Sequence, residues 1–162
     1  MTVLPLTIKA MWSAEERGRQ GEFADIGPQF LPLPAHKTAE AAGIDLHAAV
    51  DGQVLPRRRL MVPTGLCIEL PPGTVGLVAV RSGLSVKYGL RLVNGVGIVD
   101  SDFRGELVLC LTTDELLGFR RGDRLCQLVV ANYRPLALKL VDELSRTDRG
   151  VGGWGSTGGH GG

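Results

Sequence analysis

The sequence predicts an all-β fold, a distorted jelly roll or β-barrel with one short helical turn. Three observations lead to this prediction. Helical periodicity is nearly absent from the 162 residues. Short runs rich in Val, Leu and Ile are instead separated by turn residues such as Pro71–Gly73 and Asn94-Gly95. Glycine accounts for 23 residues, about twice the usual share of roughly 7%. Short strands at this spacing are typical of antiparallel sandwiches and jelly rolls.

The expected strands follow from the apolar runs between these turns. In chain order they are residues 6–11, 43–50, 60–70, 74–80, 106–111, 123–133 and 136–141. The helical turn is expected at residues 84–88, directly after Arg81-Ser82-Gly83. The length predicts one domain over residues 1–148, because the chain is too short for two ordinary ones.

Two segments differ from the rest of the chain. Residues 13–30 are polar and irregular, which predicts a flexible insertion. Residues 149–162 contain eight glycines and almost no apolar surface, so this tail cannot fold around a core of its own. The tail is therefore either a disordered end or a segment that becomes ordered on a partner or ligand.

Charge and composition exclude several classes of protein. The formal net charge is +1 with both signs interspersed, so no basic face suited to nucleic acid is expected. We interpret Arg57–Arg59 as a solvated turn. No apolar run reaches the roughly 20 residues of a membrane span, and no signal peptide is evident. Three cysteines within apolar runs indicate a reducing compartment, the cytoplasm, or the nucleus in a eukaryotic host. The scattered histidines show no zinc spacing.

The glycine-rich tail contains Gly150–Gly155, which formally satisfies G-x-G-x-x-G. A dinucleotide-binding fold is excluded because no strand precedes the motif, no helix follows it, and the chain ends nearby. Arg149, successive glycine N–H groups and the Ser156-Thr157 hydroxyls can nevertheless surround phosphate oxygens. On its own this signal is weak, since glycine-rich ends are usually only flexible.

Arg81-Ser82-Gly83 lies where an apolar strand meets the expected helical turn. Free N–H groups at such a turn favour an anion, and Arg81 and Ser82 add a charge and a hydroxyl. An N-cap serine beside a surface arginine explains this segment equally well.

Asn94–Glu106 is typical of a hairpin that begins with a polar amide and returns with a pair of carboxylates. Its main chain and the Asn94 side chain can recognise a planar base, because both donate and accept hydrogen bonds. Asp100 can act as a general base on water. Taken alone, an ordinary Asn-Gly turn with loop aspartates is the simpler interpretation of this segment.

Five stretches taken together resemble, in order and spacing, the five motifs of the trimeric all-β dUTPase family. They are Gly43–Leu46, Arg81–Gly89, Asn94–Glu106, Arg121–Leu128 and Arg149–Gly158. The resemblance runs from about Leu31 to the C-terminus. It implies a homotrimer of jelly-roll subunits that hydrolyses dUTP to dUMP and pyrophosphate with Mg²⁺. Such an activity limits uracil entry into DNA and supplies dUMP for dTMP synthesis. Each active site is expected to draw motifs from three chains, with the tail closing over it.

The resemblance also implies a role for each matching residue. Asp100 would deprotonate the water that attacks the α-phosphorus, and Asp45 would support the site and the water shell of the metal. No residue is expected to bind Mg²⁺ directly, because substrate phosphates and water hold it. Phosphates are expected at Arg81, Ser82, Gly83 and Gln127. Uracil and deoxyribose are expected at Asn94, Gly97, Ile98, Val99 and Phe103. The tail would contribute Arg149, Trp154, Gly155 and Ser156.

The chain departs from the family pattern at two aromatic positions. Phe103 stands where the family usually has Tyr, and Trp154 stands where it often has Phe. Both rings can still stack on the nucleoside. Two alternative functions for this fold predict different residues. A related dCTP deaminase would require a glutamate base in the hairpin and a serine-rich second motif. A dUTPase-like binding or regulatory module without catalysis would show damage at Asp100, Arg81, Gln127 or the tail, and all of these are intact.

Overall fold

A computed structural model describes residues 8–17 and 31–152 of the chain. These residues are mostly strand, which confirms the predicted all-β class. The strands are β1 (Lys9–Trp12), β2 (Gly43–His47), β3 (Gly52–Val54), β4 (Leu60–Glu69), β5 (Thr74–Val80), β6 (Arg91–Leu92), β7 (Gly97–Val99), β8 (Glu106–Thr112), β9 (Leu117–Phe119) and β10 (Arg124–Asn132). The helix α2 (Ser82–Tyr88) lies between β5 and β6, and a shorter helical turn at residues 14–17 follows β1. No helix in the described ranges is long and apolar enough to cross a membrane.

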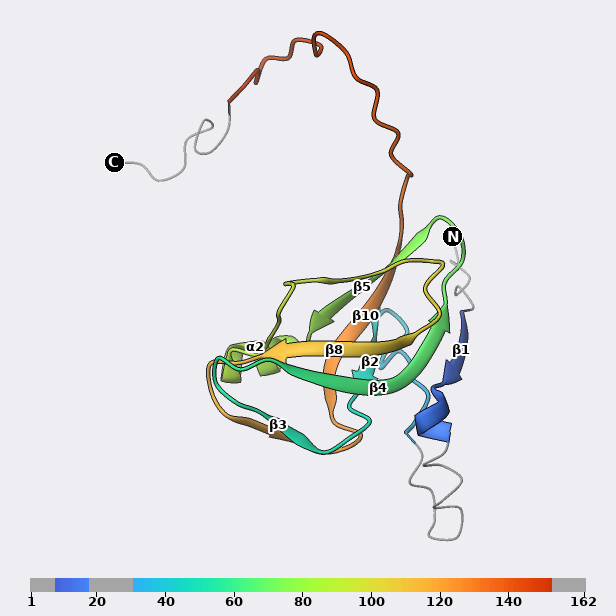
Figure 1. Cartoon of the computed structure of the whole chain (residues 1–162), viewed down its shortest axis with the longest axis vertical. Coiled ribbons are helices and arrows are strands. Elements are labelled where there is room, and N and C mark those ends of the chain that lie inside the picture. The colour runs from blue at the N-terminus through green and yellow to red at the C-terminus, as the bar shows by residue number, and fades with distance from the viewer. Residues whose placement is uncertain (1–7, 18–30, 153–162) are drawn as a thin grey trace, which may run out of the picture.

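Two four-stranded antiparallel sheets form the body of the molecule. Their strand orders are β1-β4-β8-β6 and β2-β10-β5-β7, and β3 with β9 forms a small third sheet. Figure 1 shows β4 and β8 running alongside each other. Alternate residues of β8 point inward, so Leu107, Leu109 and Leu111 are buried while Val108 is exposed. The core between the sheets consists mainly of leucine and valine, as a sandwich requires.

The structure confirms most of the expected elements and moves some of their ends. β5 has the predicted bounds, and β4 and β10 each lie within one residue of them. The helix begins at Ser82, two residues before the predicted turn. Residues 136–141 form no strand, although their sequence alternates like one. Leu136, Leu138 and Leu140 are 90%, 98% and 99% exposed, because no strand of residues 8–17 or 31–152 pairs with them.

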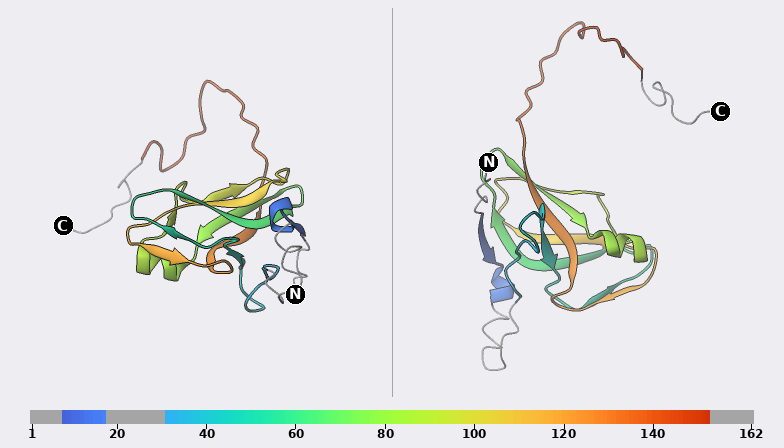
Figure 2. Two further views of the ribbon diagram at one scale, coloured as in Figure 1. Left: turned by 60° about the horizontal axis from the view of Figure 1, so that its bottom comes forward. Right: turned by 180° about the vertical axis from the view of Figure 1, so that it is seen from behind.

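The chain leaves the body of the molecule after β10. Tyr133 donates its N–H to the Gly73 carbonyl, and residues 134–151 are exposed. Figure 1 and the two further views in Figure 2 show this segment running clear of the strands. The packed part of the chain therefore ends near residue 133.

Residues 13–17 differ from the expectation of a flexible insertion over 13–30. They form a helical turn directly after β1, in which Ser13 and Glu16 are buried at 8% and 1% exposure. The sequence does not indicate this burial, because Ser13 and Glu16 are both polar. Their side chains can be buried because both have hydrogen-bond or ion-pair partners. Residues 18–30 lie outside the described part of the chain.

The three cysteines are free thiols. Cys67 and Cys126 are buried, as expected, while Cys110 is partly exposed. Burial raises the pKa of the Cys126 thiol to about 12, which keeps it protonated and unreactive. Cys67 and Cys126 therefore behave as small apolar core residues.

Candidate active site

Asp45 on β2 lies at the centre of an ion-pair cluster with Arg124 at the start of β10 and Arg81, which follows β5. Its Oδ1 lies 3.3 Å from Arg81 Nε, and its Oδ2 lies 3.0 Å from Arg124 Nη1. Arg81 also donates through Nη1 to the Arg124 carbonyl oxygen at 3.3 Å. The Asp45 side chain is 13% exposed and both arginines are 37% exposed. The carboxylate therefore orients two guanidinium groups that remain open to a ligand on their outer side. We call Asp45, Arg81 and Arg124 the Asp45 cluster.

The strand register explains why these residues meet. Gln127 of β10 lies opposite Asp45 on β2 and opposite Ala79 on β5, so all three share one face. The β10–β2 register shifts between Arg124 and Cys126. In a regular strand Arg124 and Gln127, three positions apart, would point to opposite faces. The irregularity places both on the outer face and keeps Leu125 in the core.

Arg81-Ser82-Gly83 forms the start of α2. Arg81 is the N-cap residue, with extended dihedrals of φ −70° and ψ 132°, and no side chain caps the helix. The alternative of an N-cap serine is therefore wrong, because Ser82 is already helical. Ser82 and Gly83 are both exposed, so their backbone lies beside the open face of Arg81.

The Asn94–Glu106 segment forms a hairpin-like excursion along the edge of a sheet. Gly95 has φ +75°, a conformation that L side chains rarely adopt, and β7 then pairs with β5 from Gly97 to Val99. The excursion borders a cleft of about 350 Å³. Six predicted site residues line this cleft: Asn94, Gly97, Ile98, Val99, Asp100 and Phe103. We call it the hairpin cleft.

Asp100 directly follows β7 and is exposed. Its carbonyl oxygen accepts from the Phe103 N–H at 3.2 Å. Arg104 Nη1 donates to the carbonyl oxygens of Ser101 and Phe103 at 2.7 and 2.9 Å, which closes the turn. Within the described part of the chain, the Asp100 carboxylate takes part in no hydrogen bond or ion pair. Its oxygens are available to water.

Phe103 projects over the following turn. Its side chain is 43% exposed, and a Cβ added to Gly105 would lie 2.6 Å from Phe103 Cζ. Glycine at position 105 therefore allows the ring to lie against the backbone. The exposed part of the ring lines the hairpin cleft.

The predicted site residues of one chain lie in separate places. A second cleft, of about 320 Å³, is lined by Arg81 and Arg124 of the Asp45 cluster together with Leu84, Tyr88 and Gly122. Asp100 lines the hairpin cleft instead. Arg149 is exposed on the segment that leaves the body. Trp154, Gly155 and Ser156 lie outside the described residues.

Two residues beside Asp45 have no role predicted from the sequence. Arg124 belongs to the Arg121–Leu128 stretch without an expected contact, and His47 lies two positions after Asp45 on the same face of β2. Burial lowers the pKa of the His47 imidazole below its usual 6.5. Asp45 opposes this shift, whereas Lys37, Arg124 and Arg81 reinforce it. The alternation of β2 was the signal that could have identified His47.

A metal site made only of protein side chains is not evident. Over residues 8–17 and 31–152, no three His, Cys, Asp or Glu side chains are grouped closely enough to hold an ion. Asp45 already binds two guanidinium groups. The exposed carboxylate of Asp100 is compatible with contact to the water shell of a hydrated cation.

This architecture places a cationic cluster and a polar edge-strand cleft on one β-sandwich, as in a nucleotide-binding enzyme. The family model for dUTPase matches residues 30–158. The chain therefore belongs to the dUTPase family, as its five motifs predicted. It is 46% identical over 130 residues to the deoxyuridine 5'-triphosphate nucleotidohydrolase of Anaeromyxobacter sp. (strain Fw109-5), covering 79% of this chain and 88% of that relative. The enzyme of the same name from Corynebacterium glutamicum is 45% identical over 131 residues, with the same coverage.

Solved structures show the same fold. The dUTPase of Staphylococcus bacteriophage 80alpha, in complex with dUPNHPP, superposes with a TM-score of 0.79 at 22% identity, over 94% of this chain and 98% of that one. A variant dUTPase of phage phi11 of S. aureus, studied for the coordination of a structural Mg(II) ion, superposes with a TM-score of 0.70 at 20% identity, over 85% and 98% of the two chains. The predicted jelly-roll class is confirmed.

Proposed function

We propose that this dUTPase-family hydrolase converts dUTP to dUMP and pyrophosphate, with Asp100 as the general base. The observation that carries the proposal is the position of Asp100. Its carboxylate is exposed beside a cleft that Asn94 and Phe103 also line. A carboxylate with free oxygens can accept a proton from water, and the neighbouring amide and ring can hold a nucleoside.

The hairpin cleft has the groups that a pyrimidine base requires. β7 is the last strand of its sheet, so the N–H and C=O groups on its outer edge are free to bind a planar ligand. Asn94 adds a side-chain amide that both donates and accepts. In this proposal the backbone of Gly97, Ile98 and Val99 recognises uracil. Phe103 stacks against the deoxyribose and leaves little room for a ribose 2′-hydroxyl.

The Asp45 cluster has the charge and geometry to hold a phosphate chain. A nucleoside triphosphate carries about four negative charges, and its hydrolysis depends mainly on positioning and charge neutralisation. Asp45 orients Arg81, which presents its guanidinium beside the exposed backbone of Ser82 and Gly83. Gln127 adds an amide from the same face. Our candidates for the phosphate ligands are Arg81, Ser82, Gly83 and Gln127.

Magnesium is the proposed cofactor. Phosphate oxygens and water are the preferred ligands of Mg²⁺ at such sites, and they would hold the ion between substrate and protein. Bound Mg²⁺ neutralises phosphate charge and orients the chain for attack at the α-phosphorus. Asp45 would support this side of the site through the arginines that it orients, and Asp100 would act on the attacking water.

A homotrimer with shared active sites is the assembly we propose. Asp100 and Arg81 line different clefts of one chain, so a site that uses both is best completed by neighbouring chains. The exposed leucines of residues 136–140 support an arm that lies on another subunit. In this assembly residues 1–148 form the domain. The tail, with Arg149, Trp154, Gly155 and Ser156, closes over a neighbour's site. Free thiols favour a reducing compartment, and we propose the cytoplasm.

The test is pyrophosphate release from dUTP, dTTP, dCTP and UTP, with and without Mg²⁺, on protein whose oligomeric state is measured by light scattering. We expect a trimer that strongly prefers dUTP and requires Mg²⁺. Hydrolysis of none of the four by a folded trimer would favour a binding module instead. Ammonia release from dCTP would indicate a deaminase.

A further inference from the structure

The N-terminal segment, residues 8–17, lies upstream of the dUTPase match, which begins at residue 30. It is nevertheless attached firmly to the sandwich. β1 pairs with β4 from Lys9↔Glu69 to Trp12↔Leu66, and the turn that follows buries Ser13 and Glu16. A glutamate that is 1% exposed is unusual unless a cation is bound to it. A cationic partner for the Glu16 carboxylate is therefore expected.

The local sequence Ser13-Ala14-Glu15-Glu16 has the S-x-x-E spacing of a helix capping box. In that motif the serine oxygen accepts from the glutamate N–H, and the glutamate side chain returns to the serine N–H. Of these two hydrogen bonds, the one from the glutamate N–H is formed as in the motif: Glu16 N donates to Ser13 Oγ at 3.2 Å. Ser13 N donates to the Gly65 carbonyl oxygen instead, at 2.6 Å. This exchange leaves the Glu16 carboxylate for a more distant partner.

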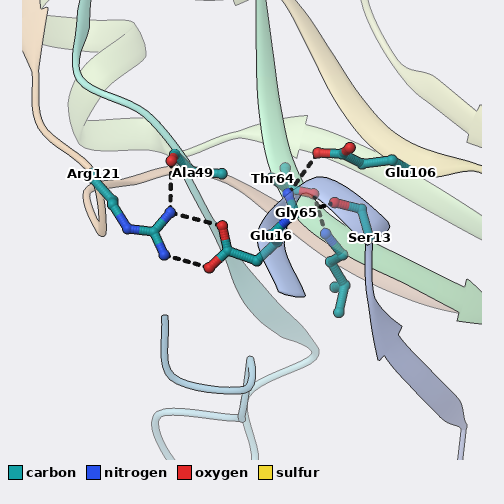
Figure 3. Close-up of polar contacts among 8 residues, drawn as sticks. Ser13, Glu16, Ala49, Thr64, Gly65, Glu106 and Arg121 are labelled. Carbon is teal, nitrogen blue, oxygen red and sulfur yellow. Dashed lines mark hydrogen bonds and ion pairs between the residues drawn. The ribbon is translucent and has the colours of Figure 1, made fainter. Parts of the chain in front are cut away.

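That partner is Arg121, in the loop between β9 and β10. The guanidinium binds the carboxylate with two parallel contacts, Nη1 to Oε2 at 2.8 Å and Nη2 to Oε1. Arg121 Nη1 also donates to the Ala49 carbonyl oxygen at 2.6 Å. Figure 3 shows this arrangement, with Glu16 pointing from the turn toward Arg121. Two-point contacts of this kind hold both orientation and distance.

The Glu16 side chain packs against β4 at Gly65. Gly65 lies at a register shift between Pro63 and Cys67 and has φ +72°. A Cβ added there would lie 2.9 Å from Glu16 Cγ. Gly65 also donates its N–H to Glu106 Oε1 at 2.7 Å. The irregular part of β4 thus leaves space for the Glu16 side chain. The hydrogen bond of Gly65 also joins this part of β4 to Glu106, at the end of the Asn94–Glu106 segment.

Arg121 in turn connects to the Asp45 cluster through its own loop. Gly122 donates to the Ala48 carbonyl oxygen and Ala48 donates to that of Asp123, both at 2.8 Å. These bonds join the loop to the end of β2, three residues after Asp45. Arg124, which contacts Asp45, is the first residue of β10, directly after this loop. A displacement of Arg121 would therefore move the backbone that carries Arg124.

From these contacts we infer that Glu16 is a positioning residue for the phosphate side of the site. It holds Arg121, and through the β9–β10 loop it sets the position of Arg124 and the orientation of Asp45 and Arg81. The inference rests on the proposed function, since it concerns the groups assigned to the phosphate chain. It extends the functional part of this chain upstream of the dUTPase match.

The test compares two ligands by calorimetry on the full-length chain with Mg²⁺: the non-hydrolysable analogue dUPNHPP and the product dUMP. We expect Glu16→Gln to weaken dUPNHPP binding about tenfold, an ordinary size for coupling between neighbouring groups. dUMP lacks the two terminal phosphates, so its affinity should change by less than about threefold. The double variant Glu16→Gln/Arg121→Gln should bind dUPNHPP no more weakly than Arg121→Gln, because both act through one contact.

The matched control is Glu69→Gln. It removes the exposed ion pair between Lys9 and Glu69 at 3.1 Å, which anchors the same N-terminal strand without reaching the loop. We expect it to bind both ligands like the wild type. If Glu16→Gln destabilises the fold, Glu16→Asp keeps the charge with a shorter reach and should show the same selective loss for dUPNHPP.

Two results would overturn the inference. One is unchanged dUPNHPP affinity in folded Glu16 variants, and the other is an equal loss for both ligands, which would indicate a purely structural role. A wild-type chain that binds neither ligand would overturn the proposed function, and the inference with it. Wild-type binding without an effect of Glu16 would overturn the inference alone.

Discussion

The Asp45 cluster and the hairpin cleft use carboxylates in opposite ways. Asp45 is 13% exposed and lies between two guanidinium groups. Asp100 is exposed, and no described side chain pairs with it. A carboxylate held by two cations serves best as a support, because its oxygens are already occupied. An exposed carboxylate with free oxygens can take a proton from water.

The backbone around the two regions differs in the same sense. The Asp45 cluster stands on the edge strand β2, on the central strand β10 and on Arg81, the residue that follows β5. The hairpin cleft stands on β7, a three-residue strand with a partner on one side only. β10 has a partner strand on each side, and the two ion pairs of Asp45 hold the side chains of the cluster together, whereas the Asp100 carboxylate on the hairpin side has no such contact among the described residues. The cationic side is thus preorganised, and the hairpin side can adjust to a ligand.

The strongest test of this contrast is Asp100→Asn. We expect turnover of dUTP to fall by about a thousandfold, within the range for loss of a general base. Affinity for dUPNHPP should remain within about threefold, because the phosphate and base contacts are retained. Steady-state kinetics and calorimetry measure the two effects. Asp102→Asn, an exposed neighbour, is the control. Near-native turnover in Asp100→Asn would show that another group is the base.

Asp45→Asn should act on binding and stability rather than on the chemical step. Asp45→Asn removes the charge of a largely buried carboxylate and leaves two partly exposed arginines without their anionic partner. We expect KM for dUTP to rise about tenfold with kcat little changed, together with a lower Tm. The control is Asp114→Asn, which breaks a pair with Arg91 whose side chains are 62% and 49% exposed and should be nearly neutral. A fall in kcat with unchanged KM would assign Asp45 to the chemical step.

Phe103→Ala tests whether the hairpin side discriminates by shape. The ring is held against Gly105, so removing it opens the cleft without disturbing the Asp45 cluster. We expect the preference for dUTP over UTP in kcat/KM to decrease about tenfold, an ordinary value for the loss of apolar contacts. Phe103→Tyr should retain the preference. If Phe103→Ala discriminates as well as the wild type, the ribose is recognised elsewhere.

The smallest expected effect concerns His47 beside Asp45. Burial lowers the pKa of this imidazole below its usual 6.5, so at acidic pH the unfolded chain binds a proton more readily than the folded chain. Stability is therefore fully present above pH 6.5 and is lost as the pH falls toward the lowered pKa of the folded state. His47→Gln should reduce the decrease in Tm between roughly pH 7.5 and 5.5 by a few degrees. Equal decreases in both proteins would contradict this account.

Much of the fold could be predicted from local patterns. Residues 74–80 form an apolar run that begins directly after the turn residues Pro71–Gly73, and the structure gives β5 those same bounds. Residues 136–141 show a similar pattern but form no strand. The difference is physical, because a strand needs a partner edge and a local pattern contains no information about one. The polar residues 13–17 show the opposite error, because their sequence predicts exposure, whereas Glu16 is buried against the distant Arg121.

The all-β class, the order of the main strands and membership of the dUTPase family could all be predicted from the amino-acid sequence. These properties depend on residue type and spacing along the chain, which alternation and turn chemistry express directly. Only the tertiary structure decided that Arg124 meets Asp45, that Glu16 holds Arg121, and that Asp100 and Arg81 line different clefts. Those contacts join residues up to 105 positions apart. They depend on strand register and on irregularities such as the shift between Arg124 and Cys126, which a linear pattern does not specify.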